Sequence, residues 1–192
     1  MAELAPRFDV SAAGSDERAA EGFARARFPF YGYPLARTAN PFADLRTLFA
    51  LVRLMRRVRP DIVHAFATKP AVWGRIAAHL ARIPVVIGTI PGLGSLFAPD
   101  SGRSGLTRAI YLRLQKMACG WSDLTIFQNH SDRDRFVAEG LVEESRTRVI
   151  LSSGVRTAQY GPDTDRSAAA GEFRRSIEVP ENAIIVTMVS RL

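Results

Sequence analysis

Polar side chains and glycines follow four of the strands that this chain predicts, each at the point where a strand ends. In chain order these segments are Ala67-Thr68-Lys69, Pro91-Gly92-Leu93-Gly94-Ser95, Gln128-Asn129-His130-Ser131 and Ser152-Ser153-Gly154-Val155-Arg156. Parallel strands bring their carboxyl ends to one edge of a sheet, and ligands of open α/β sheets bind at that edge. Backbone N–H groups and helix N-termini there suit a phosphate or a sugar. The four segments together therefore predict one shared binding edge.

Single residues at this edge also have purely structural interpretations. A glycine such as Gly92 or Gly94 also serves a turn that needs a positive φ angle. Asn129 or Ser131 also caps a helix. His64 lies on a strand near the same edge, and it is either a hydrogen-bonded core histidine or a group that bonds a ligand hydroxyl. The residues alone leave both interpretations open, and only the combination of four segments favours binding.

Several catalytic and metal-binding signatures are absent from the sequence. It has no Gly-Lys-Ser/Thr phosphate loop, no Gly-x-Ser-x-Gly elbow and no His-Glu-x-x-His pair. Cys119 is the single cysteine, so a disulfide within the chain and a thiolate metal cluster are excluded. Its apolar surroundings predict a buried core residue. The Gly92-x-Gly94 pair lacks the third glycine of a dinucleotide-binding fingerprint, and we expect no metal and no resident cofactor.

The elements that must position this edge alternate between short β-branched runs and longer helical patterns. We expect strands at 8–11, 27–30, 61–66, 85–90, 124–127, 148–151 and 183–189. We expect helices at 42–58, 70–80, 104–119 and 131–139, with a short helix around Phe173. Pro60 ends the first helix, and Ser131 is predicted to open a capping box. This alternation predicts an α/β, Rossmann-like parallel sheet with helices on both faces.

Two of the predicted helices combine an apolar stripe with several arginines. In the segment 42–59 the stripe that we expect to be buried comprises Leu45, Leu48, Phe49, Val52 and Met55. Arginines stand beside it at positions 46, 53, 56, 57 and 59. The segment 103–116 repeats the pattern. Each segment is either an ordinary packed helix with a solvated basic face or a helix that docks on an anionic membrane.

The overall charge points to anionic partners. Lys and Arg number 26 against 19 Asp and Glu, a formal net charge of +7. Nucleic acid is disfavoured because basic and aromatic residues do not interleave as base stacking requires. The N-terminal residues do not read as a secretory signal, and no apolar run reaches the roughly 20 residues of a membrane span. We expect a cytoplasmic protein, free or peripheral on the inner face of the plasma membrane.

Motifs along residues 59–192 resemble those of family 4 glycosyltransferases. In chain order they read Arg-Pro-Asp-Ile-Val-His-Ala-Phe from 59, Gly-Thr-Ile-Pro-Gly-Leu-Gly-Ser-Leu-Phe from 88, Phe-Gln-Asn-His-Ser-Asp-Arg from 127, Ser-Gly-Val from 153 and Val-Ser-Arg-Leu from 189. The nearest branch is similar to bacterial transferases that extend undecaprenyl-diphosphate-linked sugars in polysaccharide and glycan assembly. The resemblance implies a GT-B fold, in which two Rossmann-like domains enclose the active site.

The resemblance also implies roles for particular residues. The reaction would be configuration-retaining and independent of metal, with a nucleotide sugar, UDP-linked, as a substrate and not a cofactor. The hexose or N-acetylhexosamine would pass to a lipid-linked saccharide. Arg191 would bind the donor diphosphate through charge-assisted hydrogen bonds. No catalytic residue is assigned. The acceptor-binding set would comprise His64, Thr68, Lys69, Gly92, Gly94 and Asn129.

The order of the motifs predicts an acceptor-side domain at 1–156, a linker with a short helix at 157–182 and the first strand of a donor-side domain at 183–192. Members of the family begin with a strand and a glycine-rich loop ahead of the equivalent of residue 8. We expect this chain to lack both and to be inactive alone. Two alternatives stay open. One is a UDP-sugar 2-epimerase-like protein of the same architecture, and the other is a truncated, non-catalytic domain that binds a membrane or a partner.

Overall fold

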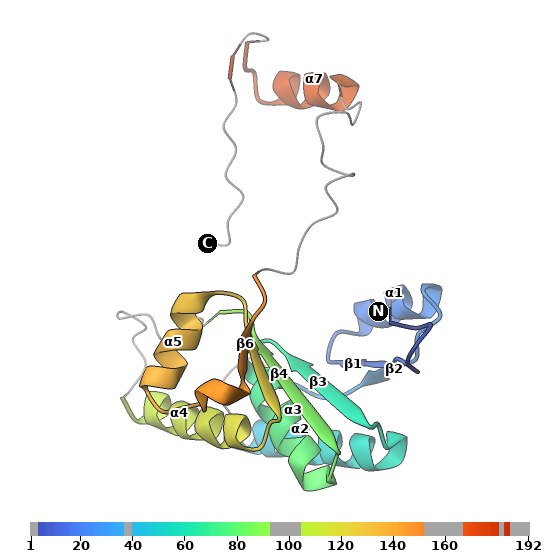
Figure 1. Ribbon diagram of the computed structural model, residues 1–192. Coiled ribbons are helices and arrows are strands. Elements are labelled where there is room, and N and C mark those ends of the chain that lie inside the picture. Colours follow the sequence, from blue (N-terminus) through green and yellow to red (C-terminus); the bar gives the residue numbers. More distant parts are fainter. Residues whose placement is uncertain (1–3, 37–39, 93–104, 152–166, 181–182, 185–192) are drawn as a thin grey trace. The chain divides into compact units, whose positions relative to one another are not determined.

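The computed structural model describes residues 4–36, 40–92, 105–151, 167–180 and 183–184. The chain divides into two compact units, residues 1–153 and 154–192. The described strands all belong to the first unit and form two parallel sheets, one of two strands and one of four (Figure 1).

The smaller sheet pairs β1 (Ala12–Gly14) with β2 (Phe30–Gly32) in parallel. Helix α1 (Glu17–Arg25) connects the two strands. Phe23 of this helix stacks on Phe30, with ring centroids 5.4 Å apart, and so holds the helix against the sheet. An aromatic contact of this kind contributes about 0.5–1.5 kcal/mol beyond the burial of its area.

The N-terminal strands and helix differ from the sequence-based expectations. Both strands lie further along the chain than the predicted segments 8–11 and 27–30. Strands of three residues depend on pairing with each other more than on local propensity, so their exact positions leave little trace in the sequence. Helix α1 was not predicted, because Phe23 is its one large apolar residue and no apolar stripe marks it.

The larger sheet has the strand order β3-β4-β5-β6, with every neighbouring pair parallel. The strands are β3 (Ile62–Phe66), β4 (Val85–Ile90), β5 (Leu124–Phe127) and β6 (Thr147–Val149). The helices are α2 (Pro41–Val58), α3 (Thr68–Ala81), α4 (Gly105–Gly120) and α5 (His130–Ala138), with a 3₁₀ turn at Glu144–Arg146. In Figure 1, α2, α3 and α4 lie together along the sheet. The predicted α/β class, with parallel strands flanked by helices, is confirmed.

The start of α5 corrects one prediction. The side-chain oxygen of Asn129 accepts a hydrogen bond from the N–H of Asp132 at 2.7 Å, so Asn129 caps the helix, which begins at His130. The predicted capping box at Ser131 is therefore wrong. Asn129 has an extended backbone and a short amide that reaches the free N–H groups of the first turn, as an N-cap requires.

The main apolar core joins α2, α3 and β4. Leu51 and Met55 of α2 pack with Ala77 and Ala78 of α3 and with Val86 of β4. Small residues on α3 let α2 approach closely, and a fully buried Leu or Met contributes about 1.5–3 kcal/mol. Cys119 is buried in a second cluster, as predicted.

A buried arginine forms a polar centre inside this core. Arg75 is fully buried, and its Nε donates to the Ala71 carbonyl at 2.7 Å while its Nη2 donates to Oε1 of Gln115 at 2.7 Å. Its Nη1 donates to Thr125 Oγ1 at 3.4 Å. Gly88 of β4 leaves room for it, because a Cβ there would lie 2.6 Å from Cδ of Arg75. Arg75 therefore ties α3 to α4 and β5 through neutral acceptors.

The apolar stripe predicted for α2 is wrong in part. Leu45 is 48% exposed and Phe49 is 65% exposed, although both were expected in the core. Thr47 takes a core position because its hydroxyl donates to the Pro34 carbonyl at 2.7 Å, which rotates the helix relative to the predicted stripe. The buried residues of α2 are Thr47, Leu51 and Met55.

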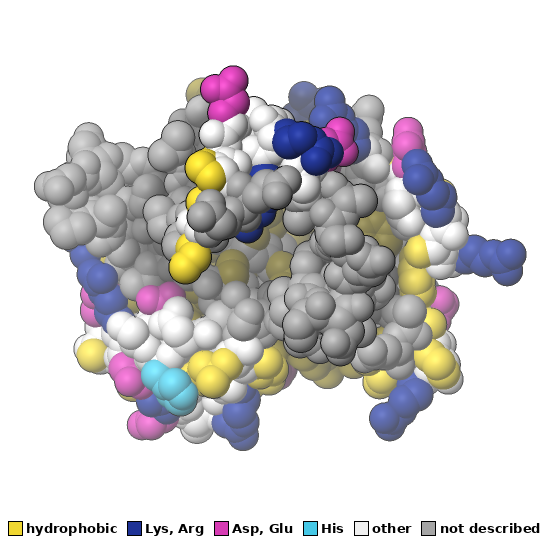
Figure 2. All heavy atoms as spheres, turned by 90° about the horizontal axis from the view of Figure 1, so that it is seen from above, with side chains coloured by type: hydrophobic (Ala, Val, Ile, Leu, Met, Phe, Trp, Pro, Cys, Tyr) yellow, Lys and Arg dark blue, Asp and Glu magenta, His cyan; other side chains and the backbone are white. Residues whose placement is uncertain are grey.

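Charged side chains are spread over the face of the molecule that Figure 2 shows. Figure 2 shows Lys and Arg side chains at several separate places on the face seen from above, with Asp and Glu among them, so positive charge forms no single field there.

In the second unit, α7 (Ser167–Ser176) matches the helix predicted around Phe173. Most of the strand predicted at 183–189 lies outside the described residues. In the described part of the chain, every helix is too short or too polar to cross a membrane.

Candidate functional site

The carboxyl ends of β3, β4, β5 and β6 can be followed in the described residues, and ligand binding at this edge stays a prediction. The register pairs Phe66 of β3 with Thr89 of β4, and Phe127 of β5 with both Ile90 of β4 and Val149 of β6. The carboxyl ends of these parallel strands therefore align, and the residues that follow them share one edge, where ligands of open α/β sheets bind. Gly94 and the segment 152–156, which we also predicted at this edge, lie outside the described residues.

His64 of β3 is positioned by its neighbours near this edge. Its Nε2 lies 2.7 Å from Oγ1 of Thr89, which is buried on the adjacent strand. Its ring lies against that of Phe66, with centroids 4.0 Å apart. Burial lowers the pKa of the imidazole below its ordinary value of 6.5, so the ring is neutral at neutral pH. A neutral imidazole has one nitrogen that donates and one that accepts.

Helix α3 begins directly after β3 with an unusual backbone. Ala67, its N-cap residue, has φ 73° and ψ 178°, a region that glycine normally occupies. No side chain caps the helix, and its first turn carries no acidic residue. The N-terminal N–H groups of α3, including that of Thr68, thus begin at the binding edge, and helix N-termini favour anions.

The ammonium group of Lys69 contacts a carboxylate and a backbone carbonyl on neighbouring segments. Its ammonium nitrogen lies 2.6 Å from Oδ1 of Asp44 on α2 and donates to the Ala36 carbonyl at 2.8 Å. These contacts fix the first turn of α3 beside the first turn of α2. The assignment of Lys69 to the acceptor site stays a prediction, and its described contacts position helices.

Gly92 and Asn129 stand at the ends of β4 and β5. A Cβ added at Gly92 would meet no heavy atom of the described residues within 4 Å. The amide of Asn129 caps α5, and its Nδ2 also donates to Oδ2 of Asp132 at 2.9 Å. Asn129 therefore shapes the start of α5, and its contact with an acceptor stays a prediction, as does that of Gly92.

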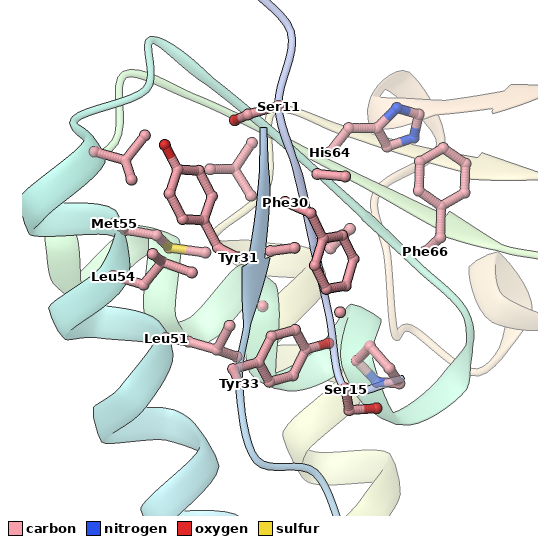
Figure 3. A pocket seen from close by; sticks show the side chains of 18 of the residues that line it. Ser11, Ser15, Phe30, Tyr31, Tyr33, Leu51, Leu54, Met55, His64 and Phe66 are labelled. Atoms are coloured by element: carbon pink, nitrogen blue, oxygen red, sulfur yellow. The ribbon is translucent and has the colours of Figure 1, made fainter. Parts of the chain in front are cut away.

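A largely apolar cavity of about 490 Å³ borders the edge. It runs between the two sheets, since every residue of β1 and of β3 lines it together with residues of β2 and α2. Figure 3 shows Tyr31 beside Leu54 and Met55 of α2, while His64 and Phe66 lie side by side at another part of the wall. The sequence did not predict this cavity, because the short strands β1 and β2 were misplaced.

Other features of the site have little signal in the sequence. The strained backbone at Ala67 is unmarked, since alanine usually avoids positive φ. The ring of His79 stacks on that of Trp121, with centroids 4.2 Å apart. Arg191, the predicted donor-side residue, lies outside the described residues. Among the described residues, no group of three or more His, Cys, Asp or Glu side chains could hold a metal ion.

A family model described as a glycosyl transferase 4-like domain matches residues 1–151. The chain belongs to this family. The resemblance drawn from the motifs is thereby confirmed. The match covers the described part of the first unit, including the ends of β3, β4 and β5.

Two curated relatives of this glycosyl transferase 4-like chain are named transferases. The UDP-Gal:alpha-D-GlcNAc-diphosphoundecaprenol alpha-1,3-galactosyltransferase of Escherichia coli is 28% identical over 164 residues, which cover 85% of this chain and 40% of the relative. The N,N'-diacetylbacillosaminyl-diphospho-undecaprenol alpha-1,3-N-acetylgalactosaminyltransferase of Campylobacter jejuni is 26% identical over 152 residues, covering 79% and 40%. The chain thus spans about 40% of the length of these relatives.

The fold of this glycosyl transferase 4-like chain also resembles that of a solved epimerase structure. The structure of UDP-N-acetylglucosamine 2-epimerase from Rickettsia bellii has a TM-score of 0.58 at 14% sequence identity, covering 93% of this chain and 46% of that chain. At this identity the likeness shows the fold alone. The epimerase alternative is therefore less supported than the transferase, whose named relatives share more of the sequence.

Proposed function

We propose that this chain is the acceptor-side part of a glycosyltransferase that moves a hexose or N-acetylhexosamine from a nucleotide sugar to an undecaprenyl-diphosphate-linked saccharide. The observation that carries the proposal is the family match over residues 1–151. Both curated relatives are named for acceptors with a diphosphoundecaprenol group. On this proposal the protein works at the inner face of the plasma membrane.

The geometry supports the binding of a diphosphate-linked sugar at the strand ends. The N–H groups at the start of α3, with Thr68, favour an anion, and the first turn of that helix has no acidic residue of its own, while the nearby Asp44 is paired with Lys69. His64 and Thr89 offer polar atoms on the neighbouring strands. At the end of β4, no atom of the described residues lies within 4 Å of a Cβ built on Gly92. On this proposal the diphosphate lies at the α3 N-terminus and the sugar extends toward β4.

Binding of the acceptor can be tested without the rest of the protein's activity. The experiment titrates the ¹⁵N-labelled chain with a water-soluble, short-chain prenyl diphosphate carrying N-acetylglucosamine and follows amide chemical shifts. We expect shifts at Thr68, Gly92 and Asn129. Free N-acetylglucosamine should cause much smaller changes, because it lacks the diphosphate that the helix N-terminus favours.

A glycine pair supplies the matched control. Gly92→Val should block the open edge and weaken acceptor binding, whereas Gly32→Val, where an added Cβ also meets no atom within 4 Å, should leave binding unchanged. Absence of acceptor binding, or shifts confined to other parts of the chain, would contradict the proposal.

A further inference from the structure

The cavity between the two sheets is bordered by two strand edges that no described strand covers. Among the described residues, β3 pairs with β4 on one side only, and β1 pairs with β2 on one side only. Every residue of β1 and of β3 lines this cavity of about 490 Å³. We call the cavity, with the edges of β1 and β3 that border it, the inter-sheet slot. An uncovered strand edge presents a row of backbone N–H and C=O groups, which bind another strand readily.

The hydrogen bonds of β3 show which of its backbone groups face the slot. The N–H of Val85 on β4 donates to the Asp61 carbonyl at 3.1 Å. In a parallel strand, alternate residues turn their backbone groups to opposite neighbours, so residues 61, 63 and 65 turn theirs toward β4. The other residues of β3 turn theirs away from β4, namely Ile62, His64 and Phe66.

The walls of the inter-sheet slot are largely apolar. Leu51, Leu54 and Met55 line it from α2, and Figure 3 shows them together along that helix. On β3, the side chains of Ile62 and Phe66 are 47% and 57% exposed, whereas strands of a parallel sheet are ordinarily buried on both faces. A strand in the slot would lie against both sets of side chains. We therefore expect its occupant to carry apolar residues at nearly every position.

A strand suits the slot better than an apolar small molecule or a lipid chain does. Such a ligand would cover the apolar walls but would give no hydrogen bond to the backbone groups of β1 and β3. Each backbone group left buried and unpaired costs about 1–3 kcal/mol. The described strands of a second copy are already paired within sheets, so none of them can enter the slot without leaving its own sheet. These constraints favour a single extended segment of another polypeptide.

We propose that the inter-sheet slot binds an extended, β-branched segment of a partner polypeptide, which pairs with β3 in parallel. Every described strand pair of this chain is parallel, and an occupant of that direction continues the pattern. Main-chain hydrogen bonds supply the affinity of such β-augmentation, and the apolar walls select the side chains. Because β3 has five residues, about five residues of the partner pair with it, over an extended length of roughly 16 Å.

The direction of the occupant has a consequence for the candidate site. A strand parallel to β3 ends beside Phe66, next to Ala67 and the N-terminus of α3. Residues that follow the bound segment therefore enter the edge at which the proposed function places the acceptor diphosphate. This second step rests on the proposed function, whereas strand binding itself rests on the slot alone.

A synthetic peptide tests the proposal on the whole 192-residue chain. The probe has alternating valines and isoleucines between two terminal lysines and carries a fluorescent label, and fluorescence anisotropy follows its binding. We expect saturable binding, with amide chemical-shift changes of the ¹⁵N-labelled chain concentrated in β1 and β3. Absence of saturable binding, or changes confined to other elements, would overturn the proposal.

A second probe separates strand pairing from simple apolar binding. It has the same side chains but carries N-methyl groups on alternate amides, so it keeps the apolar surface and loses hydrogen bonds along one edge. It should bind about fivefold more weakly for each hydrogen bond lost. Equal binding of the two probes would show an apolar cavity in place of a strand site and would overturn the proposal.

A matched pair of variants locates the binding. Ala13 is exposed and lines the cavity, so Ala13→Trp places a large side chain in the slot and should abolish saturable binding of the probe. Ala26→Trp, at an exposed residue outside the cavity lining, should leave binding unchanged. Thermal melting checks that both variants retain the fold. Equal affinities of the two folded variants would contradict the assignment. So would a dimer at micromolar concentration that Ala13→Trp dissociates, because a second copy would then occupy the slot.

The two proposals fail separately. The probe carries neither sugar nor phosphate, and the acceptor titration contains no peptide. A chain that binds acceptor but ignores the probe would overturn the strand site and leave the proposed function standing, and the opposite result would do the reverse. With both present, the last lysine of the bound probe lies near the N-terminus of α3 and should tighten acceptor binding. Unchanged acceptor affinity would overturn that second step.

Discussion

We expect a single methyl group, added by Gly88→Ala in β4, to destabilise the first unit strongly. A Cβ at Gly88 would lie 2.6 Å from Cδ and 2.8 Å from Nε of Arg75, whereas nonbonded carbon atoms prefer about 3.5–4.0 Å. Arg75 is fully buried, and short hydrogen bonds to Ala71 and Gln115 hold its guanidinium in place. The side chain therefore cannot swing into water to relieve the clash.

Three contributions set the expected magnitude. Overpacking of a core costs about 1–3 kcal/mol. Loss of one hydrogen bond from the charged Arg75 costs about 1.5–3 kcal/mol. Alanine in place of glycine inside a strand ordinarily stabilises by about 0.5–1 kcal/mol. The net loss is about 3 kcal/mol, a large share of the 5–15 kcal/mol typical of a folded domain.

Urea denaturation, followed by circular dichroism, measures this loss directly. A loss of about 3 kcal/mol should also lower the Tm by roughly 6–12 °C. Gly22→Ala in α1 is the control, because an added Cβ there meets no heavy atom within 4 Å. That variant should be as stable as the parent chain or slightly more stable.

A double-mutant cycle separates the clash from other effects of the substitution. Arg75→Met removes the guanidinium that the new methyl group would strike. The combined variant Gly88→Ala, Arg75→Met should be less destabilised than the sum of the single variants, by more than about 1 kcal/mol. If Gly88→Ala retained parent stability, or if the two losses simply added, the packing of Arg75 against β4 would not have the energetic role described here.

Three further predictions concern the ion pair, the histidine and the helix cap near the binding edge. Lys69→Met leaves Asp44 largely buried without its cation and should lower the free energy of unfolding, measured by urea denaturation, by about 2 kcal/mol. Arg25→Met, at a solvent-exposed pair, should lower it by under about 0.5 kcal/mol. Equal losses for the two variants would contradict this prediction. Burial lowers the pKa of His64 below 6.5, so the unfolded chain binds more protons as the pH falls through that value. Stability should therefore fall below about pH 6.5, and His64→Gln should flatten that part of the profile; an unchanged profile would count against it. Asn129→Ala should cost about 1 kcal/mol through loss of the α5 cap, and a neutral result would show that the first turn does not depend on it.

Much of the fold was accessible from the sequence because periodicity and β-branched runs are strong in the centre of the chain. The strands at 85–90 and 124–127 have the predicted bounds. Elements that depend on distant contacts were not accessible. Helix α1 carries a single large apolar residue, and the orientation of α2 follows from a hydrogen bond between Thr47 and Pro34 that no periodicity reveals.

The candidate site, like the fold, could be predicted from the sequence only in part. Glycines and polar residues after the strands predicted a candidate site at one edge of the sheet, because loop chemistry is local and follows strand ends. The settings of individual residues were not predictable. Lys69 looked like a ligand-binding cation, but its contact with Asp44 depends on how α2 packs on α3. The burial of Arg75 depends on how the helices and the sheet pack around it.

The cavity between the two sheets has a consequence for handling the protein at high concentration. Within the described residues, β1 and β3 each pair on one side only, and both line that cavity. A strand with an unpaired edge is a template for another extended chain, through β-augmentation, exchange of segments between copies, or aggregation. Because both unpaired strand edges face the cavity between the two sheets, the tendency of this chain to self-associate should rise with the concentration of other extended segments in solution.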